Sequence, residues 1–266
     1  MNRFWSMLFL LVPTLAVGSF GLMFANVGPL AKGRWPIVAS DSTAAMDQLF
    51  ENVHLLAAVI LVGTGGTIAW IVWRNGASSF TNRKAQYFSG NLKLELVWSV
   101  VPAGILIFLA CYQTSIWQEQ KLNRPVTRRA GQEFEVSPMV RVIAKQFGWT
   151  FQYAGPDEKF QTTDDLFVEN LMVVPAHEPI VMQLTSRDVI HSMYIPDLRF
   201  KQDIVPGRDL IGWFQADRSC DSEIFCSELC GSGHYRMKAI LKIVEHSDFE
   251  SWIDAMIADQ QPRFAD

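Results

Sequence analysis

The sequence has little charge of either sign and no cluster of basic residues. It holds 23 Lys and Arg against 27 Asp and Glu, for a formal net charge of −4. A chain that binds nucleic acid is expected to carry a basic patch with Lys and Arg gathered on one face. The composition therefore excludes nucleic acid as a partner.

Cysteine is scarce, and no Cys-x-x-Cys-His motif for covalent haem attachment occurs. Of the four cysteines, Cys111 lies in an apolar run, whereas Cys220, Cys226 and Cys230 lie within eleven residues. This uneven spacing is not typical of a disulfide framework. We interpret Cys111 as a buried apolar residue and Cys220 as a free thiol or loop residue.

Charge is missing from three long runs, 4–31, 55–73 and 96–112. A membrane-crossing helix needs about 20 apolar residues, so the second run, and the third with its flanks, predict a transmembrane helical hairpin over residues 46–117. The first run is longer than the apolar core of a secretory signal, which spans about 7–15 residues. Residues 1–31 are therefore either a signal peptide or an additional membrane anchor.

The loop between the second and third runs has four basic residues and one acid, Glu95. The positive-inside rule places such a loop in the cytoplasm. Everything after residue 118 then lies outside the cytoplasm, and we expect a multi-pass protein of the bacterial inner membrane with a periplasmic domain. The basic residues are Arg74, Arg83, Lys84 and Lys93.

After residue 118 the apolar segments become short and rich in β-branched and aromatic residues. Turn signals such as Gly155-Pro156, Pro175 and Pro206-Gly207 separate them, which predicts an all-β sandwich of about seven strands. A short amphipathic helix is expected near the C-terminus. The expected strands are 140–144, 149–153, 171–174, 180–185, 193–195, 210–215 and 237–244.

Metal-binding residue types crowd into the stretch 226–237, with His191 upstream. Two thiolates four residues apart can face one point when nearby glycines let the backbone fold closely. Mononuclear zinc would leave Met237 unused, and a single blue copper needs only one thiolate. Two thiolates, two imidazoles and a thioether suit a pair of sulfur-bridged copper ions. The stretch reads Cys226-Ser-Glu228-Leu-Cys230-Gly-Ser-Gly-His234-Tyr-Arg-Met237.

This pattern, Cys-x-Glu-x-Cys-x3-His-x2-Met, resembles the loop signature of cytochrome oxidase subunit II. The resemblance continues in Asp188-Val-Ile-His191, Gln146-Phe-Gly-Trp149 and Glu95-Leu-Val-Trp98. It implies a membrane-anchored α + all-β chain, with a transmembrane helical hairpin followed by a cupredoxin-like β-sandwich or barrel. Residues 118–247 would form the extracytoplasmic copper domain, and 248–266 a C-terminal helix and tail.

The resemblance also implies a dinuclear copper centre in which two thiolates bridge both ions. An imidazole and a thioether complete one ion, and an imidazole with a backbone carbonyl completes the other. The Glu228 side chain would bind Mg²⁺ at the interface with the catalytic subunit. The implied metal-binding residues are Cys226 and Cys230 as bridges, His191 with Met237, and His234 with Glu228.

Five residues bear on proton and electron transfer. From its place alone Glu95 is an interfacial residue, whereas the resemblance makes it the entrance of a proton path. Phe147 and Trp149 would lie near the point where electrons enter, but Phe147 stands where the family has Trp. Arg187-Asp188 stands where the family tends to have two acids. Both departures weaken the expectation of a basic cytochrome c, so the donor is an unusual or membrane-tethered cytochrome.

The resemblance implies the electron-accepting subunit of a terminal respiratory oxidase. A c-type cytochrome would reduce the copper centre, which would pass electrons to the haem of catalytic subunit I, where oxygen reduction drives proton pumping. The first alternative is a membrane-anchored protein that binds or delivers copper. A subunit of a quinol-oxidising relative would have lost the copper ligands, all of which are present. Nitrous-oxide reductase needs a propeller domain for which this chain has no room.

Overall fold

The computed structural model describes residues 2–24, 40, 43–75, 87, 89–129, 131–157 and 159–260. These residues fall into two compact units, one helical and one β-rich. The helical unit ends at Thr114, and the β-rich unit begins at Ser115 and also takes in Ser40 and Thr43. The boundary follows the change in the sequence from long apolar runs to short β-forming segments.

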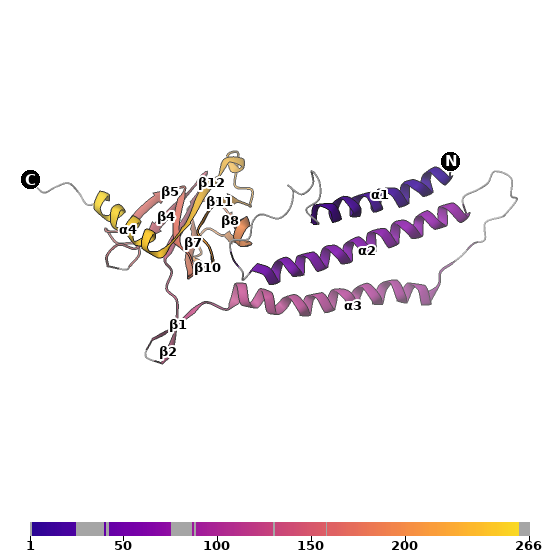
Figure 1. Cartoon of the computed structure of the whole chain (residues 1–266), viewed down its shortest axis with the longest axis horizontal. Helices are drawn as coiled ribbons and strands as arrows, with labels where there is room; N and C mark the ends of the chain where they lie inside the picture. Colours follow the sequence, from indigo (N-terminus) through magenta and orange to yellow (C-terminus); the bar gives the residue numbers. More distant parts are fainter. Residues whose placement is uncertain are drawn as a thin grey trace, which may run out of the picture. The chain divides into compact units, whose positions relative to one another are not determined.

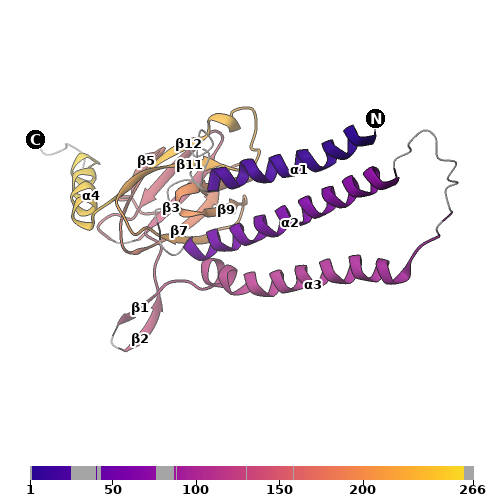
Figure 2. The same cartoon turned by 45° about the vertical axis from the view of Figure 1, so that its right-hand side comes forward.

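The described part of the helical unit has three helices, α1 (Asn2–Phe24), α2 (Ala44–Asn75) and α3 (Leu92–Trp117), which run side by side (Figures 1 and 2). Each is long and apolar enough to cross a membrane, since about 20 residues at about 1.5 Å per residue span the hydrocarbon core. The hairpin formed by α2 and α3 is the predicted one. The chain is therefore anchored in a membrane.

Helix α1 packs against α2 through small residues. The hydroxyl of Ser6 donates a hydrogen bond to the backbone oxygen of Ala69 at 2.7 Å, and both residues are buried. A Cβ atom added to Gly65 would lie 2.7 Å from Cγ of Pro13. Close approach at small side chains, with a hydroxyl bonded across the interface, is typical of helix pairs in membranes.

The β-rich unit is a sandwich of two five-stranded sheets, with strand orders β10-β7-β3-β4-β5 and β6-β12-β11-β8-β9. A separate two-stranded hairpin, β1-β2, precedes it, and helix α4 (His246–Gln260) follows it (Figure 1). The strands are β1 (Val126–Arg129), β2 (Gln132–Glu135), β3 (Val140–Lys145), β4 (Gly148–Tyr153), β5 (Leu166–Glu169), β6 (Leu171–Pro175), β7 (Pro179–Ser186), β8 (His191–Ile195), β9 (Phe200–Ile204), β10 (Leu210–Gln215), β11 (Cys220–Cys226) and β12 (Lys238–Val244).

Side chains from both sheets form one apolar core. Along β12, Ala239, Leu241 and Ile243 are buried while the residues between them face outward, because successive side chains of a strand point to opposite faces. The apolar side of α4 covers one edge of this core, where Trp252 meets Tyr153 edge to face with ring centres 5.2 Å apart. The core gives the β-rich unit a rigid frame of its own.

The predicted fold class, apolar helices followed by a cupredoxin-like all-β domain, is confirmed. The prediction of about seven strands was wrong, because the described residues form twelve. The strands that were not predicted are β1, β2, β5, β9 and β11. In β11 the buried positions are the polar Ser222 with Ile224 and Cys226, so the apolar half of its alternating pattern is weak. Pairing with β8 and β12 makes it a strand. The domain boundaries within residues 25–39 and 261–266 lie outside the described residues.

Candidate metal centre

Three strand ends meet at one end of the second sheet. Strand β8 begins at His191, β11 ends at Cys226, and β12 begins directly after Met237. Because β11 runs antiparallel to both neighbours, its end lies beside the start of each. Strand pairing therefore brings His191 to the loop 227–237, which closes the β11–β12 hairpin.

Backbone hydrogen bonds hold both ends of this loop. The N–H of Cys226 donates to the oxygen of Met237 at 3.2 Å, and the N–H of Ser227 donates to the oxygen of Ser192 at 2.9 Å. The first bond joins the two ends of the loop, and the second joins the loop to the strand that carries His191. The side chains within the loop therefore have defined positions relative to that imidazole.

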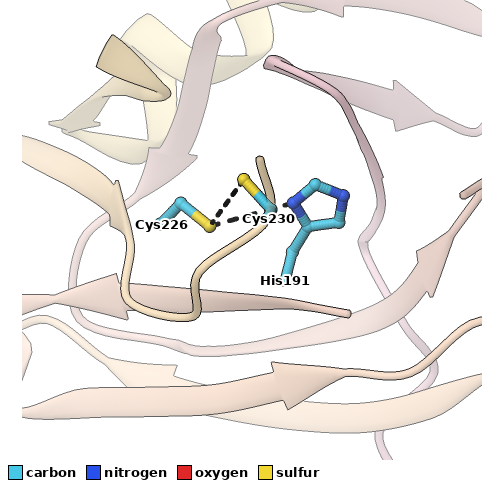
Figure 3. Close-up of side chains that lie close together, drawn as sticks. All are labelled: His191, Cys226 and Cys230. Atoms are coloured by element: carbon cyan, nitrogen blue, oxygen red, sulfur yellow. Dashed lines mark hydrogen bonds between the residues drawn. The ribbon is translucent and has the colours of Figure 1, made fainter. Parts of the chain in front are cut away.

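The thiols of Cys226 and Cys230 and the imidazole of His191 converge in the centre of the site (Figure 3). Their ligand atoms all lie within 4.8 Å of one another, and the three residues are buried. The two Sγ atoms are 3.8 Å apart, and Sγ of Cys226 is 3.8 Å from Nδ1 of His191. This group could hold a metal ion.

The other three residues expected to bind metal lie around this group. Nδ1 of His234 is 3.6 Å and Sδ of Met237 is 3.8 Å from Sγ of Cys230. The backbone oxygen of Glu228 accepts a hydrogen bond from the thiol of Cys226 at 3.2 Å. The structure thus brings together all six positions, while the side chain of Glu228 is exposed.

Asp188 is a functional residue that the sequence motif did not reveal. Its Oδ1 accepts hydrogen bonds from Nε2 of His191 at 2.8 Å and from the N–H of Val189 at 2.7 Å. Its Oδ2 accepts one from the N–H of Gln146 at 2.7 Å. The carboxylate orients the imidazole with Nδ1 toward the thiols, as carboxylates commonly do for histidine ligands. Its place three residues before His191 was the available signal.

The turn between β3 and β4 ties the first sheet to the loop. The side-chain amide of Gln146 donates to the backbone oxygen of Cys230 at 2.5 Å, a contact that sequence reasoning also missed. A Cβ atom on Gly233 would lie 2.5 Å from Cγ of Phe147, so this ring lies directly against the loop. Phe147 is half-buried there, and only glycine fits at position 233 without displacing it.

Trp149 lies deeper than Phe147. Its side chain is fully buried, and its ring packs edge-on to that of His191 with centres 6.3 Å apart. The backbone N–H of Trp149 donates to the side chain of Asn170 at 2.9 Å. Trp149 is thus a core aromatic that supports His191 from below the surface.

The two thiols are not equivalent. Burial raises the pKa of Cys226, but hydrogen bonds with His191 and with nearby backbone outweigh burial and bring this pKa down to about 6. Burial and the neighbouring negative charge of Cys226 raise the pKa of Cys230. Cys226 therefore gives up its proton more readily than Cys230, and a metal held by both sulfurs would displace their protons, because thiolate is the form that binds metal.

The donor set matches copper. Two thiols, a thioether and two imidazoles are ligands that copper accepts readily, and a loop held by backbone bonds supplies them from within a buried site. Zinc would use the thiols and imidazoles but has no need of the thioether of Met237. The residues present therefore fit a copper centre better than a structural zinc site.

Glu95 lies outside this site, in the first turn of α3. Its Oε1 accepts a hydrogen bond from the N–H of Asn91 at 3.2 Å, while Oδ1 of Asn91 accepts bonds from the N–H groups of Lys93 and Leu94. This reciprocal pattern caps the start of the helix much as a capping box does. Helix capping is thus one role of Glu95.

The two remaining cysteines are not among the metal-binding residues. Cys220 is half-buried at the start of β11, the end opposite to Cys226. The prediction that Cys111 is buried was wrong for this chain, because Cys111 is exposed on α3. A helix that crosses a membrane leaves part of its apolar surface to lipid or to other subunits, so an apolar run does not by itself imply burial within the chain.

Two family models match the chain. The model described as cytochrome c oxidase subunit II, transmembrane domain, matches residues 34–116. The model described as cytochrome c oxidase subunit II, periplasmic domain, matches residues 139–244 and so includes the whole metal-binding loop. Together the two models cover more than half of the chain and correspond to its helical and β-rich parts.

Known proteins are similar in sequence to this chain along most of its length. A probable cytochrome c oxidase subunit 2 of Rickettsia felis is 28% identical over 268 residues, covering 94% of this chain and 79% of the relative. The cytochrome c oxidase subunit 2 of Cereibacter sphaeroides is 27% identical, covering 81% and 77%. The periplasmic domain of subunit II from Bradyrhizobium japonicum, a crystal structure, is 30% identical with a TM-score of 0.40, covering 45% of this chain and 93% of that one.

Proposed function

Because the chain belongs to the cytochrome c oxidase subunit II family, we propose that it is the subunit through which electrons enter a haem-copper terminal oxidase. A c-type cytochrome donates single electrons to a dinuclear copper centre in the β-rich unit. The electrons then pass to the haem of catalytic subunit I, where oxygen reduction is coupled to proton pumping. The donor is a separate protein, since the chain has no haem-attachment motif.

One observation carries this proposal: two buried thiols lie 3.8 Å apart with an imidazole next to each. In the proposed centre Cys226 and Cys230 would hold both copper ions, His191 and Met237 would hold one of them, and His234 with the carbonyl of Glu228 would hold the other. When bound, the copper pair takes up and releases one electron at a time. The second thiol distinguishes this set from that of a mononuclear blue copper, which uses one thiolate, two imidazoles and a weakly bound thioether.

The residues around the donors keep the site rigid. Asp188 holds the imidazole of His191, and Gln146 holds the backbone at Cys230. Phe147 lies against the loop, and Trp149 fills the core beneath His191. A donor set that is fixed before the electron arrives needs little rearrangement when the charge changes. These supporting contacts favour electron transfer over the alternative of copper delivery, which needs a site that opens to release its metal.

The exposed side chain of Glu228 is proposed to bind Mg²⁺ at the interface with catalytic subunit I, because carboxylates are ligands that Mg²⁺ prefers. Other oxidase subunits would contact the exposed apolar surfaces of α2 and α3. The membrane is proposed to be the inner membrane of a bacterium, with the β-rich unit in the periplasm. The basic loop before α3 supports this orientation.

The proposal is tested on the β-rich part, residues 115–266, purified and loaded with copper, since this part has a core of its own. We expect a visible spectrum and an electron paramagnetic resonance signal in which one unpaired electron is shared by two copper nuclei. Cys226→Ser should abolish this signal, because one bridging sulfur is lost. Cys220→Ser should leave it unchanged, because that thiol lies at the other end of β11.

A signal from a single copper ion in the unaltered protein would contradict the proposal and favour copper delivery. Equal loss of the signal in both cysteine variants would show that the protein responds to the loss of any thiol rather than to loss of a bridge.

A further inference from the structure

Exposed apolar side chains gather around the metal-binding loop. Leu229 and Tyr235 are each 79% exposed, Ile190 is 45% exposed and Val189 is 37% exposed. Each lies one or two residues along the chain from a proposed metal ligand. We call these four residues the apolar face. The other large apolar side chains exposed in the described part of the β-rich unit lie on separate elements: Trp117, Leu122, Val126, Phe134, Phe167 and Ile240.

Single exposed apolar residues are ordinary on a protein surface, but a group at a functional site marks a surface that a partner covers. The centre of a protein interface is apolar and poor in charge, with polar residues at its rim. An electron donor must come close to the metal ligands. The apolar face lies where such a partner would make its central contact.

The acids near this face are few and mostly engaged. Asp203, exposed on β9 where it pairs with Ser192, interacts with the charge of Lys121. Asp188 directs its carboxylate to His191. Glu223 forms an ion pair with Lys238 at 3.7 Å. Glu228 is exposed, and its proposed role is to bind Mg²⁺ toward the catalytic subunit. This part of the surface therefore lacks a free acidic rim that would attract a lysine-rich partner.

Two arginines supply the free charge instead. Arg187 and Arg236 are exposed, and within the described part of the chain neither forms an ion pair. Arg187 directly precedes Asp188, and its backbone N–H is bonded to the oxygen of Ala144 at 3.0 Å. Arg236 follows Tyr235 in the loop. Each arginine therefore adjoins the apolar face in the chain and gives it a positive rim.

The exposed aromatic residue at this face is Tyr235, not Phe147, which was expected near the point where electrons enter. Phe147 is half-buried, with its ring against Gly233, so little of it is left for a partner. Tyr235 directly follows His234 and is almost fully open to solvent. Tyrosine at the centre of an interface supplies a large contact area at low entropic cost.

We propose that the apolar face is the docking site of the electron donor, and that this donor is a redox protein whose apolar contact surface is rimmed by acidic side chains. This inference rests on the proposed function. Tyr235 and Leu229 make the central apolar contact. Arg187 and Arg236 attract the acidic rim, since complementary charge governs encounter rate and partner choice.

The test uses the copper-loaded oxidase that contains this chain and two probes with the same haem. One probe is a lysine-rich c-type cytochrome, and the other is the same cytochrome with its lysines succinylated, which makes them negative. Binding of the oxidised probes and the rate of electron transfer from the reduced probes are measured across ionic strengths. At about 0.01 M salt, where the Debye length is about 30 Å, we expect the succinylated probe to bind about tenfold more tightly. The preference should shrink at about 0.15 M salt.

Two pairs of substitutions separate charge from apolar contact. Arg187→Glu with Arg236→Glu should reverse the preference between the probes. Leu229→Ser with Tyr235→Ser should weaken the binding of both probes by about tenfold at every ionic strength, because central contacts carry most of the binding energy. The control is Lys159→Glu, which makes the same change of charge at a single site. Lys159 follows the end of β4, whereas Phe147 precedes its start, so the control lies away from the apolar face. This control should leave the binding of both probes, and the rate of electron transfer from them, unchanged.

Tighter binding of the lysine-rich probe would overturn this inference, and so would an unaltered preference after both arginines are reversed. Each variant is first checked for its copper signal and for reduction by a small neutral reductant. A missing dinuclear signal in the unaltered oxidase would mean that the proposed function itself has failed. A normal signal together with the wrong preference would mean that only the docking inference has failed.

Discussion

At the residue scale, Asp188 connects three parts of the site. One oxygen of its carboxylate accepts hydrogen bonds from His191 and Val189, and the other accepts the N–H of Gln146. An ionised carboxylate can accept all three, whereas an amide has one oxygen and one NH₂ group. Asp188 is therefore a positioning residue for the proposed ligand His191.

Asp188→Asn should keep the fold but weaken copper binding by about 10–100-fold, because its NH₂ group would oppose either the imidazole N–H or the N–H of Gln146. The measurement is competition for copper with a chelator of known affinity. Asp221→Asn is the matched control, since Asp221 is exposed on β11. An unchanged affinity in Asp188→Asn would mean that backbone packing alone orients the imidazole.

At the scale of elements, the close contact between α1 and α2 bears on the fate of the N-terminal segment. Besides the contacts of Ser6 and Gly65, the ring of Phe20 stacks on His54 with centres 5.0 Å apart. These contacts follow α1 from one end to the other in antiparallel order along α2. A cleaved signal peptide has no need of such a fitted surface. We therefore propose that α1 is retained as a third membrane helix.

Gly65→Leu should detach α1, because its Cβ alone would come within 2.8 Å of the backbone oxygen of Phe9. We expect a cost of about 1–3 kcal/mol. It is measured as faster maleimide labelling of a cysteine introduced at Ser6. Gly66→Leu is the control, since nothing lies within 4 Å of a Cβ there. A mature chain whose intact mass lacks α1 would contradict retention.

At the scale of the whole molecule, the chain is proposed to contribute to two separate transfers, of electrons in the β-rich unit and of protons at the membrane. Glu95 is the residue proposed for the second, as the entrance of a proton path into the catalytic subunit. The same carboxylate accepts a hydrogen bond from Asn91 that caps helix α3, so it also has a structural role. The two roles differ in one respect: capping needs an acceptor oxygen, whereas a proton path needs a group that gains and loses a proton.

Glu95→Gln separates these roles, because glutamine keeps the acceptor and loses the titratable group. If Glu95 serves the proton path, oxygen reduction and proton uptake by the purified oxidase should slow by about tenfold or more while the copper spectrum stays normal. Glu95→Ala serves as the second variant and removes both functions. Wild-type turnover in Glu95→Gln would contradict the proton path and leave Glu95 as a helix cap.

By itself the sequence determined the membrane hairpin, the all-β extracytoplasmic part and the candidate metal donors. These follow from the length of an apolar run and from residue type at short spacing, which are local properties of the chain. The sequence could not decide between signal and anchor for residues 1–31. It also did not predict β11, which ends at Cys226, because the polar Ser222 occupies one of its buried positions and weakens the apolar half of the alternation.

Only the tertiary structure decided what surrounds the donors. Asp188 reaches His191, while Gln146 and Phe147 reach the loop, and these contacts depend on how β3, β4, β8 and β11 are placed. The open position of Tyr235 beside a covered Phe147 is likewise a result of packing. Contacts between residues far apart in the chain arise from strand pairing and from the fit of side chains, and no local pattern specifies either.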